Sequence, residues 1–206
     1  MKIKLILLFA LFFAAGNCFA QEGKNILVLD DFEGEIVAGP NGTIDAGAGN
    51  GSSVEVSGDK ANKMSGEQSL KITYDAVSGG YIWVARGYGL DVKGAAKWIN
   101  EPDKIDWTRY GAISLFMLGT GSGAKIAFDV KDSGNEIFRF MLTDDSNKWK
   151  PAVCPFDQFF PRGDWQPSNA VTNGTLDFPI KSFQFEPIAI NKSTVNIDEV
   201  ILEPLN

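Results

Sequence analysis

Apolar and polar residues alternate along this chain in short runs, with the period of two that is typical of half-buried β-strands. Leu70, Ile72 and Tyr74 alternate with polar residues, and Phe183 and Phe185 do the same. Helical periodicity is almost absent, and Gly, Asn, Asp and Pro separate the runs. Further runs of this kind occur at 26–29, 81–85, 113–118, 125–130, 137–142 and 195–202.

Many short strands with frequent turn residues predict an all-β protein with two packed antiparallel sheets, most simply a jelly roll. The glycine-rich stretch 39–51 is expected to form a surface loop instead of a strand. In the closing run the apolar phase slips between Ile197 and Val200, which predicts a β-bulge at Asp198 and Glu199. No internal repeat or domain boundary is visible, so residues 21–206 are expected to form one β-sandwich domain.

The N-terminus has the organisation of a secretory signal. Lys2 and Lys4 precede an apolar run at 5–15 and a short segment that ends at Ala20, so we expect cleavage after Ala20. No run in the sequence has the roughly 20 apolar residues needed to span a bilayer. We therefore expect a secreted or periplasmic protein without a membrane span, and we expect it to be monomeric.

Composition narrows the classes of function. The chain contains no histidine, which excludes Ser/His/Asp and Cys/His nucleophilic sites and histidine-ligated zinc. A net charge of -7 without a cluster of Lys and Arg argues against nucleic acid as a partner. After cleavage Cys154 would be the only cysteine, so no internal disulfide is expected, and Cys154 is interpreted as a small buried apolar group.

Acidic residues flank both the first and the last predicted strand. Asp31 and Glu33 follow the first strand, and Asp198 lies at the predicted bulge in the last. If these strands are neighbours, the three carboxylates supply hard oxygen ligands suited to Ca²⁺, with backbone carbonyls completing the shell. The alternative is that these acidic residues lie in solvated turns.

Aromatic residues form a second group of candidates. Rings stack on the C–H faces of sugars, while carboxylates, amides and guanidinium groups bind the hydroxyls. Trp165 lies between Asp164 and Gln166, with Arg162 shortly before, so this short segment combines all of these groups. Its loop-forming neighbours predict an exposed ring. The opposite is expected for Trp83, Trp107 and Trp149, which are interpreted as core residues.

Carboxylates are also numerous enough to supply the acid pair of a glycosidase. Nothing in the sequence fixes the distance between two of them or raises the pKa of one, so catalysis is the weaker interpretation. The candidates for such a pair are Asp129, Asp132, Glu136, Asp144, Asp145 and Asp164.

Taken together, several segments resemble the family 11 carbohydrate-binding modules, which are galactose-binding-like jelly rolls attached to bacterial glucanases. The resemblance covers nearly the whole chain after residue 20. The segments that carry it are 29–34 (LDDFEG), 79–81 (GGY), Trp149-Lys150, Pro155-Phe156, Phe159, 164–167 (DWQP), 174–177 (GTLD), 180–185, 191–193 (NKS) and Asp198.

The resemblance implies a cleft on one sheet that binds a single chain of mixed-linked β-1,3-1,4-glucan or β-1,4-glucan without catalysis, together with structural calcium. Tyr81 and Arg162 match cleft residues of the family, and Trp165 replaces a tyrosine that follows an aspartate, here Asp164. Asp132 is placed near a loop aspartate of the family. Gln184, on the polar side of its strand, completes the expected ligand-binding set.

The chain also departs from the family pattern. Lys181 and Pro187 stand where the family keeps an aspartate and a tyrosine, and the early segment 39–51 offers no tyrosine. These differences leave the particular glucan open. Two alternative functions remain: a protein-interaction jelly roll resembling the complex I intermediate-associated proteins, which the secretory signal disfavours, and a glucanase component.

Overall fold

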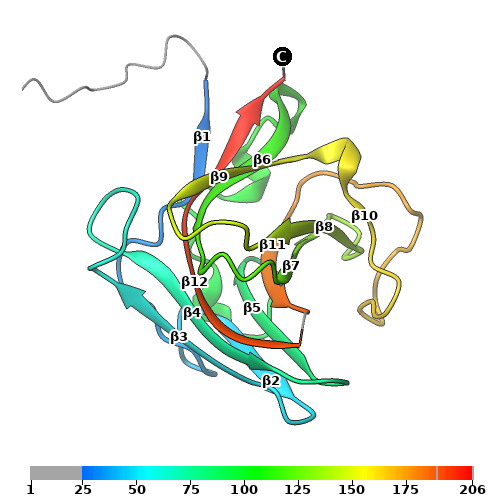
Figure 1. Ribbon diagram of the computed structural model, residues 1–206. Coiled ribbons are helices and arrows are strands. Elements are labelled where there is room, and N and C mark those ends of the chain that lie inside the picture. Colours follow the sequence, from blue (N-terminus) through cyan, green and yellow to red (C-terminus); the bar gives the residue numbers. More distant parts are fainter. Residues whose placement is uncertain (1–24, 189, 206) are drawn as a thin grey trace, which may run out of the picture.

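The computed structural model describes residues 25–188 and 190–205 of the 206-residue chain. The predicted signal segment, residues 1–20, lies outside the described residues. Twelve strands in this part of the chain form two six-stranded antiparallel sheets (Figure 1). The all-β sandwich predicted from the alternating pattern is therefore confirmed.

The first sheet has the strand order β3-β4-β12-β6-β9, with β1 added beside β12. Its long strand β12 changes partner along its length: residues 191–197 pair with β4, whereas 200–202 pair with β1. The strands of this sheet are β1 (Leu27–Asp30), β3 (Ser53–Asp59), β4 (Ser69–Ala76), β6 (Tyr110–Leu118), β9 (Lys150–Pro155) and β12 (Asn191–Pro204).

The second sheet has the order β10-β8-β7-β11-β5-β2. Within the described residues, four short 3₁₀ segments lie between strands, at Lys93–Ala95, Pro102–Lys104, Trp107–Arg109 and Phe156–Gln158. The strands of this sheet are β2 (Asp45–Gly49), β5 (Tyr81–Gly87), β7 (Lys125–Lys131), β8 (Ile137–Thr143), β10 (Phe160–Pro161) and β11 (Ser182–Pro187).

A bulge in β12 explains the slip in its apolar pattern. The pairing with β6 shifts register between Asp198 and Ile201, and Glu199 has φ of 51°. The predicted bulge is confirmed. Because the extra residue restores the alternation, both Ile197 and Val200 are fully buried.

The prediction of a loop over 39–51 is wrong for residues 45–49, which form strand β2. Residues 45–49 pair with β5 along their whole length, although their sequence is Asp-Ala-Gly-Ala-Gly. Two glycines weaken a strand because they lack side chains to pack, which is why the pattern did not indicate one. Their pairing with β5 has consequences for the site described below.

The core lies between the two sheets and is rich in phenylalanine. Phe183 and Phe185 point inward from β11, and Phe185 stacks on Phe128 of β7 with ring centroids 5.2 Å apart. Phe32, from the segment after β1, meets the edge of Phe183 at 6.2 Å. With these rings directed inward, the intervening residues of β11 and β7 are left on the outer face of the second sheet.

Candidate functional site

The outer face of the second sheet carries a row of side chains that crosses its strands. Gln184 of β11 is paired with Asp129 of β7 on one side and with Ala85 of β5 on the other. The same row continues to Arg139 of β8 and to Asp45 of β2. Residues paired across neighbouring strands present their side chains to the same face, so the sheet itself aligns these polar groups.

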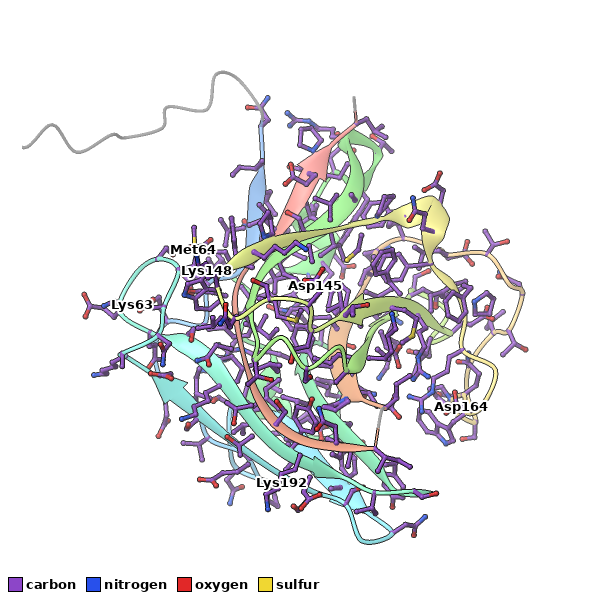
Figure 2. The ribbon with its side chains drawn as sticks, in the orientation of Figure 1. Lys63, Met64, Asp145, Lys148, Asp164 and Lys192 are labelled. Atoms are coloured by element: carbon purple, nitrogen blue, oxygen red, sulfur yellow. The ribbon has the colours of Figure 1, made fainter. Side chains whose placement is uncertain are left out.

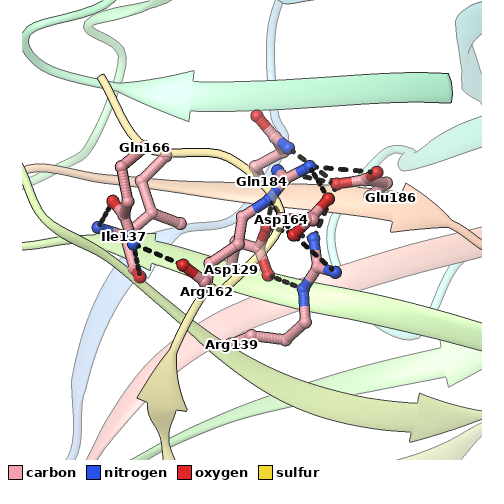
Figure 3. A network of polar contacts seen from close by, with 8 residues as sticks. All are labelled: Asp129, Ile137, Arg139, Arg162, Asp164, Gln166, Gln184 and Glu186. Carbon is pink, nitrogen blue, oxygen red and sulfur yellow. Dashed lines mark hydrogen bonds and ion pairs between the residues drawn. The ribbon is translucent and has the colours of Figure 1, made fainter. Parts of the chain in front are cut away.

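Two arginines bind three carboxylates at the centre of this face (Figure 3). Arg139 donates two parallel hydrogen bonds to Asp129, at 2.8 and 2.9 Å, and a third at 2.8 Å to Glu186. Arg162 pairs with Asp164 in the same bidentate way, at 2.9 Å for both contacts, and lies 2.8 Å from Glu186. These paired geometries fix the planes of both guanidinium groups.

Charges in this network influence one another. The hydrogen bond from Arg162 lowers the pKa of Asp164, with burial opposing the effect. Burial raises the pKa of Glu186, although Arg162 and Arg139 both oppose this rise. Each carboxylate therefore faces a guanidinium, and the side chains form a rigid set of hydrogen-bonding groups suited to polar ligands.

The loop after β10 places Arg162 and Trp165 beside the network. Gln166 anchors this loop to β8, because its side-chain amide both donates to the Ile137 carbonyl at 2.9 Å and accepts from the Ile137 N–H at 2.8 Å. The guanidinium of Arg162 lies 5.7 Å from the centre of the Trp165 ring. Trp165 is 56% exposed, which confirms the expectation of an exposed ring.

These groups line a cleft of about 820 Å³ on the second sheet. It contains five of the six residues predicted to bind a ligand, namely Tyr81, Arg162, Asp164, Trp165 and Gln184. The cleft also includes residues that sequence reasoning did not assign to a ligand: Asp45, Trp83, Asp91, Asp129, Lys131 and Glu186.

Asp132, the sixth predicted residue, is not brought to the cleft. Its side chain is fully buried just beyond the end of β7. The carboxylate accepts hydrogen bonds from the backbone N–H of Glu136 at 2.8 Å and of Asp177 at 3.3 Å. Asp132 therefore holds two loops together, which is a structural role that its position in the sequence did not reveal.

Trp83 corrects another expectation. It was interpreted as a core residue, but it is only partly buried, and it lines the cleft. Trp107 is 7% exposed and belongs to the core as expected. Trp149 is partly buried as well. The sequence pattern did not separate these tryptophans because all three are in or next to regular structure.

Two of the three residues predicted to ligate calcium, Glu33 and Asp198, bind the loop between β3 and β4. Asp198 accepts a hydrogen bond from the N–H of Met64 at 2.8 Å, and Glu33 accepts one from the N–H of Glu67 at 2.7 Å. Asp31 accepts the N–H of Glu33 at 3.1 Å. Among residues 25–188 and 190–205, no three Asp, Glu, Cys or His side chains are grouped closely enough to hold a metal ion. Backbone oxygens would have to supply the remaining ligands of a cation here.

This loop is remote from the cleft. Met64 and Asp164 lie on opposite sides of the molecule in Figure 2. A cation bound near Asp198 would therefore act on the stability of the fold and would not contact a ligand in the cleft.

A β-sandwich with an open cleft, in which exposed rings lie beside fixed carboxylate, amide and guanidinium groups, has the features of a carbohydrate-binding module. A model of the carbohydrate binding domain (family 11) matches residues 20–203, and the chain belongs to this family. The resemblance found in the sequence is thereby confirmed. No helical segment in the described part of the chain has both the length and the hydropathy to cross a membrane.

Solved structures with the same fold include two structures of family 11 modules from Clostridium thermocellum. One, in complex with a β-1,3-1,4-mixed-linked tetrasaccharide, has 24% identity and a TM-score of 0.67, over 86% of this chain and 94% of that chain. The other, from the cellulosomal cellulase Lic26A-Cel5E, has 21% identity and a TM-score of 0.66, over 89% and 95% of the two chains. A search of curated proteins found no match.

Proposed function

We propose that this module binds a single β-glucan chain, mixed-linked β-1,3-1,4 or β-1,4, in the cleft on the second sheet, and that it does so without catalysis. We further propose that it is secreted or periplasmic, which the signal-like N-terminus supports, and that it is a monomer. One observation carries the glucan assignment: the exposed ring of Trp165 lies directly beside Arg162 and Asp164, which combines a stacking surface with groups that bind hydroxyls.

The charge of the cleft favours a neutral glycan. Five carboxylates line it, whereas Lys131 and Arg162 are the cationic side chains among its lining residues. An anionic polysaccharide would meet this excess of negative charge at short range. A neutral glucan is not repelled by these carboxylates, which serve it as hydrogen-bonding groups beside the rings.

We expect the protein to be retarded in native gels that contain barley glucan, lichenan or hydroxyethylcellulose, with a dissociation constant of about 1 μM to 1 mM. Pectin, an anionic polysaccharide, serves as the control and should not retard it. Unchanged mobility in all three glucan gels would contradict the proposal. Release of reducing sugar from the same glucans would show that the module is catalytic and would overturn the noncatalytic assignment.

We also propose a calcium ion near Asp31, Glu33 and Asp198, where backbone oxygens would have to join the carboxylates as the hard donors that this cation requires. Calcium is then expected to raise the melting temperature, because a ligand that binds only the folded state stabilises it. Asp198→Ala should remove the response, whereas Asp75→Ala, at a position of β4 whose side chain is 41% exposed, should retain it. A melting curve that stays the same after chelation and after re-addition of calcium would contradict this site.

A further inference from the structure

The rings of Tyr81 and Trp83 form a continuous aromatic surface at one end of the cleft. The two residues are separated by one position on β5, so their side chains leave the same face of the sheet. Their rings are stacked, with centroids 6.0 Å apart and planes inclined by 20°. Tyr81 is 49% exposed, and both residues line the cleft.

The neighbouring strand β2 is built to receive these rings. Gly47 is paired with Trp83, and Gly49 is paired with Tyr81. A Cβ atom added at Gly47 would lie 2.4 Å from the Trp83 ring, and one added at Gly49 would lie 2.3 Å from the Tyr81 ring. Both rings therefore lie against the backbone of β2, where only glycine leaves room for them.

Asp45 fixes the orientation of the indole. Its carboxylate accepts the Trp83 Nε1–H at 2.9 Å, from a position two residues before Gly47 on the same strand. The polar atom of the ring is thus satisfied by the protein, while the ring remains part of the cleft wall. Trp83 is thereby held in one orientation without being enclosed in the core.

The position of this surface relative to Trp165 suggests its use. Trp165 approaches from the loop after β10, and β10 and β2 are opposite edges of the second sheet. Between β8, where Gln166 anchors that loop, and β5 there are three strand intervals of about 4.8 Å each. The Trp165 ring itself lies beside the Arg162 guanidinium, which contacts Asp129 of β7 and Glu186 of β11. A glycan that contacts both Trp165 and the rings on β5 therefore lies across more than one strand and presents more than one sugar unit.

We propose that Trp83 and Tyr81 form a second stacking platform, supported by Gly47 and Gly49 and oriented by Asp45, that binds sugar rings of an extended glycan chain beyond those at Trp165. The ring of Trp83 covers Gly47 of β2. This inference rests on the proposed function, since it extends the site for that ligand. Trp83 is the residue that determines how many sugar units the cleft binds.

Calorimetric titration with mixed-linked disaccharide and hexasaccharide tests this role. We expect Trp83→Ala to weaken hexasaccharide binding about fivefold and to remove most of the gain in affinity from disaccharide to hexasaccharide, because a stacking surface is lost. Trp149→Ala is the matched control, since Trp149 is also partly buried but lies outside the cleft lining. It should bind both ligands as the wild type does.

A second measurement uses the unmodified protein, so it does not depend on the folding of a variant. Tryptophan oxidation by N-bromosuccinimide is mapped by mass spectrometry with and without hexasaccharide. We expect the ligand to protect Trp83 and Trp165 but not Trp149. If the ligand protects Trp165 alone and Trp83→Ala binds hexasaccharide with unchanged affinity, the proposed platform is overturned and the proposed function stays intact. Absence of any binding by the wild type would instead refute the proposed function itself.

Discussion

Changing Asp30 to alanine is expected to lower the free energy of unfolding by about 3–5 kcal/mol, because it leaves a buried arginine without its partner. Asp30 on β1 and Arg86 on β5 join the two sheets, with Oδ2 and Nε 2.8 Å apart and both side chains at most 3% exposed. Arg86 also lies over the ring of Phe32, at 5.5 Å from its centre. Urea unfolding of the variant and the wild type measures the loss.

The burial of this ion pair indicates how the lost stability can be recovered. Burial raises the pKa of Asp30 to about 7, while Arg86 opposes the rise, so the charged carboxylate is costly to enclose. The double variant Asp30→Leu with Arg86→Met should therefore regain most of the lost stability.

The surface pair of Asp75 and Lys192, 3.3 Å apart, provides a control, since Asp75→Ala should cost less than about 1 kcal/mol. Equal stability of Asp30→Ala and Asp75→Ala would contradict this account of the buried pair.

Changing Trp165 to alanine is expected to weaken glucan binding about tenfold or more, because stacking contributes about 0.5–1.5 kcal/mol beyond the area that the ring buries. Folding should be affected little, since the side chain is 56% exposed and exposed positions usually change stability by less than about 0.5 kcal/mol. Titration calorimetry and thermal unfolding on the same preparation give both quantities.

Trp107→Ala is the opposite case and serves as the control. Trp107 is 7% exposed, and its Nε1–H donates to the carbonyl of Pro102 at 2.9 Å. Truncation of such a buried ring costs about 3–5 kcal/mol of stability. If instead Trp165→Ala melts far below the wild type while its folded fraction binds glucan normally, Trp165 belongs to the core and the cleft is wrongly placed.

Much of the fold could be predicted because apolar and polar residues alternate along strands that are buried on one face. Phe183 and Phe185 alternate with polar residues, and the slip between Ile197 and Val200 marks the bulge that is found in β12. Strand β2 could not be predicted in this way. Its glycines accommodate rings from β5, so the reason for its sequence lies on another strand.

The site could be predicted only where its residues are adjacent in the chain. Arg162, Asp164 and Trp165 form one loop, so their combined chemistry is visible in sequence. Arg139 and Glu186 join them through strand pairing alone. One signal for Arg139 was available, because a charged residue between Phe138 and Phe140 in an apolar strand requires a partner.

Asp132 shows the limit of transferring a residue role by position. It follows β7 closely, and Asp129 lies on the same strand, yet Asp129 faces the network whereas Asp132 binds backbone amides. A difference of three positions changes the face of a strand on which a side chain lies.

Amide chemical-shift mapping tests the central claim most directly, that the cleft on the second sheet is the glycan-binding site. The isotope-labelled protein is titrated with a mixed-linked β-1,3-1,4 hexasaccharide while backbone and indole N–H signals are recorded. We predict that the shifts concentrate at Tyr81, Trp83, Arg162, Trp165 and Gln184 and spare both the first sheet and Met64 in the loop between β3 and β4. Saturable shifts confined to the first sheet, or no shifts at millimolar ligand, would contradict the claim.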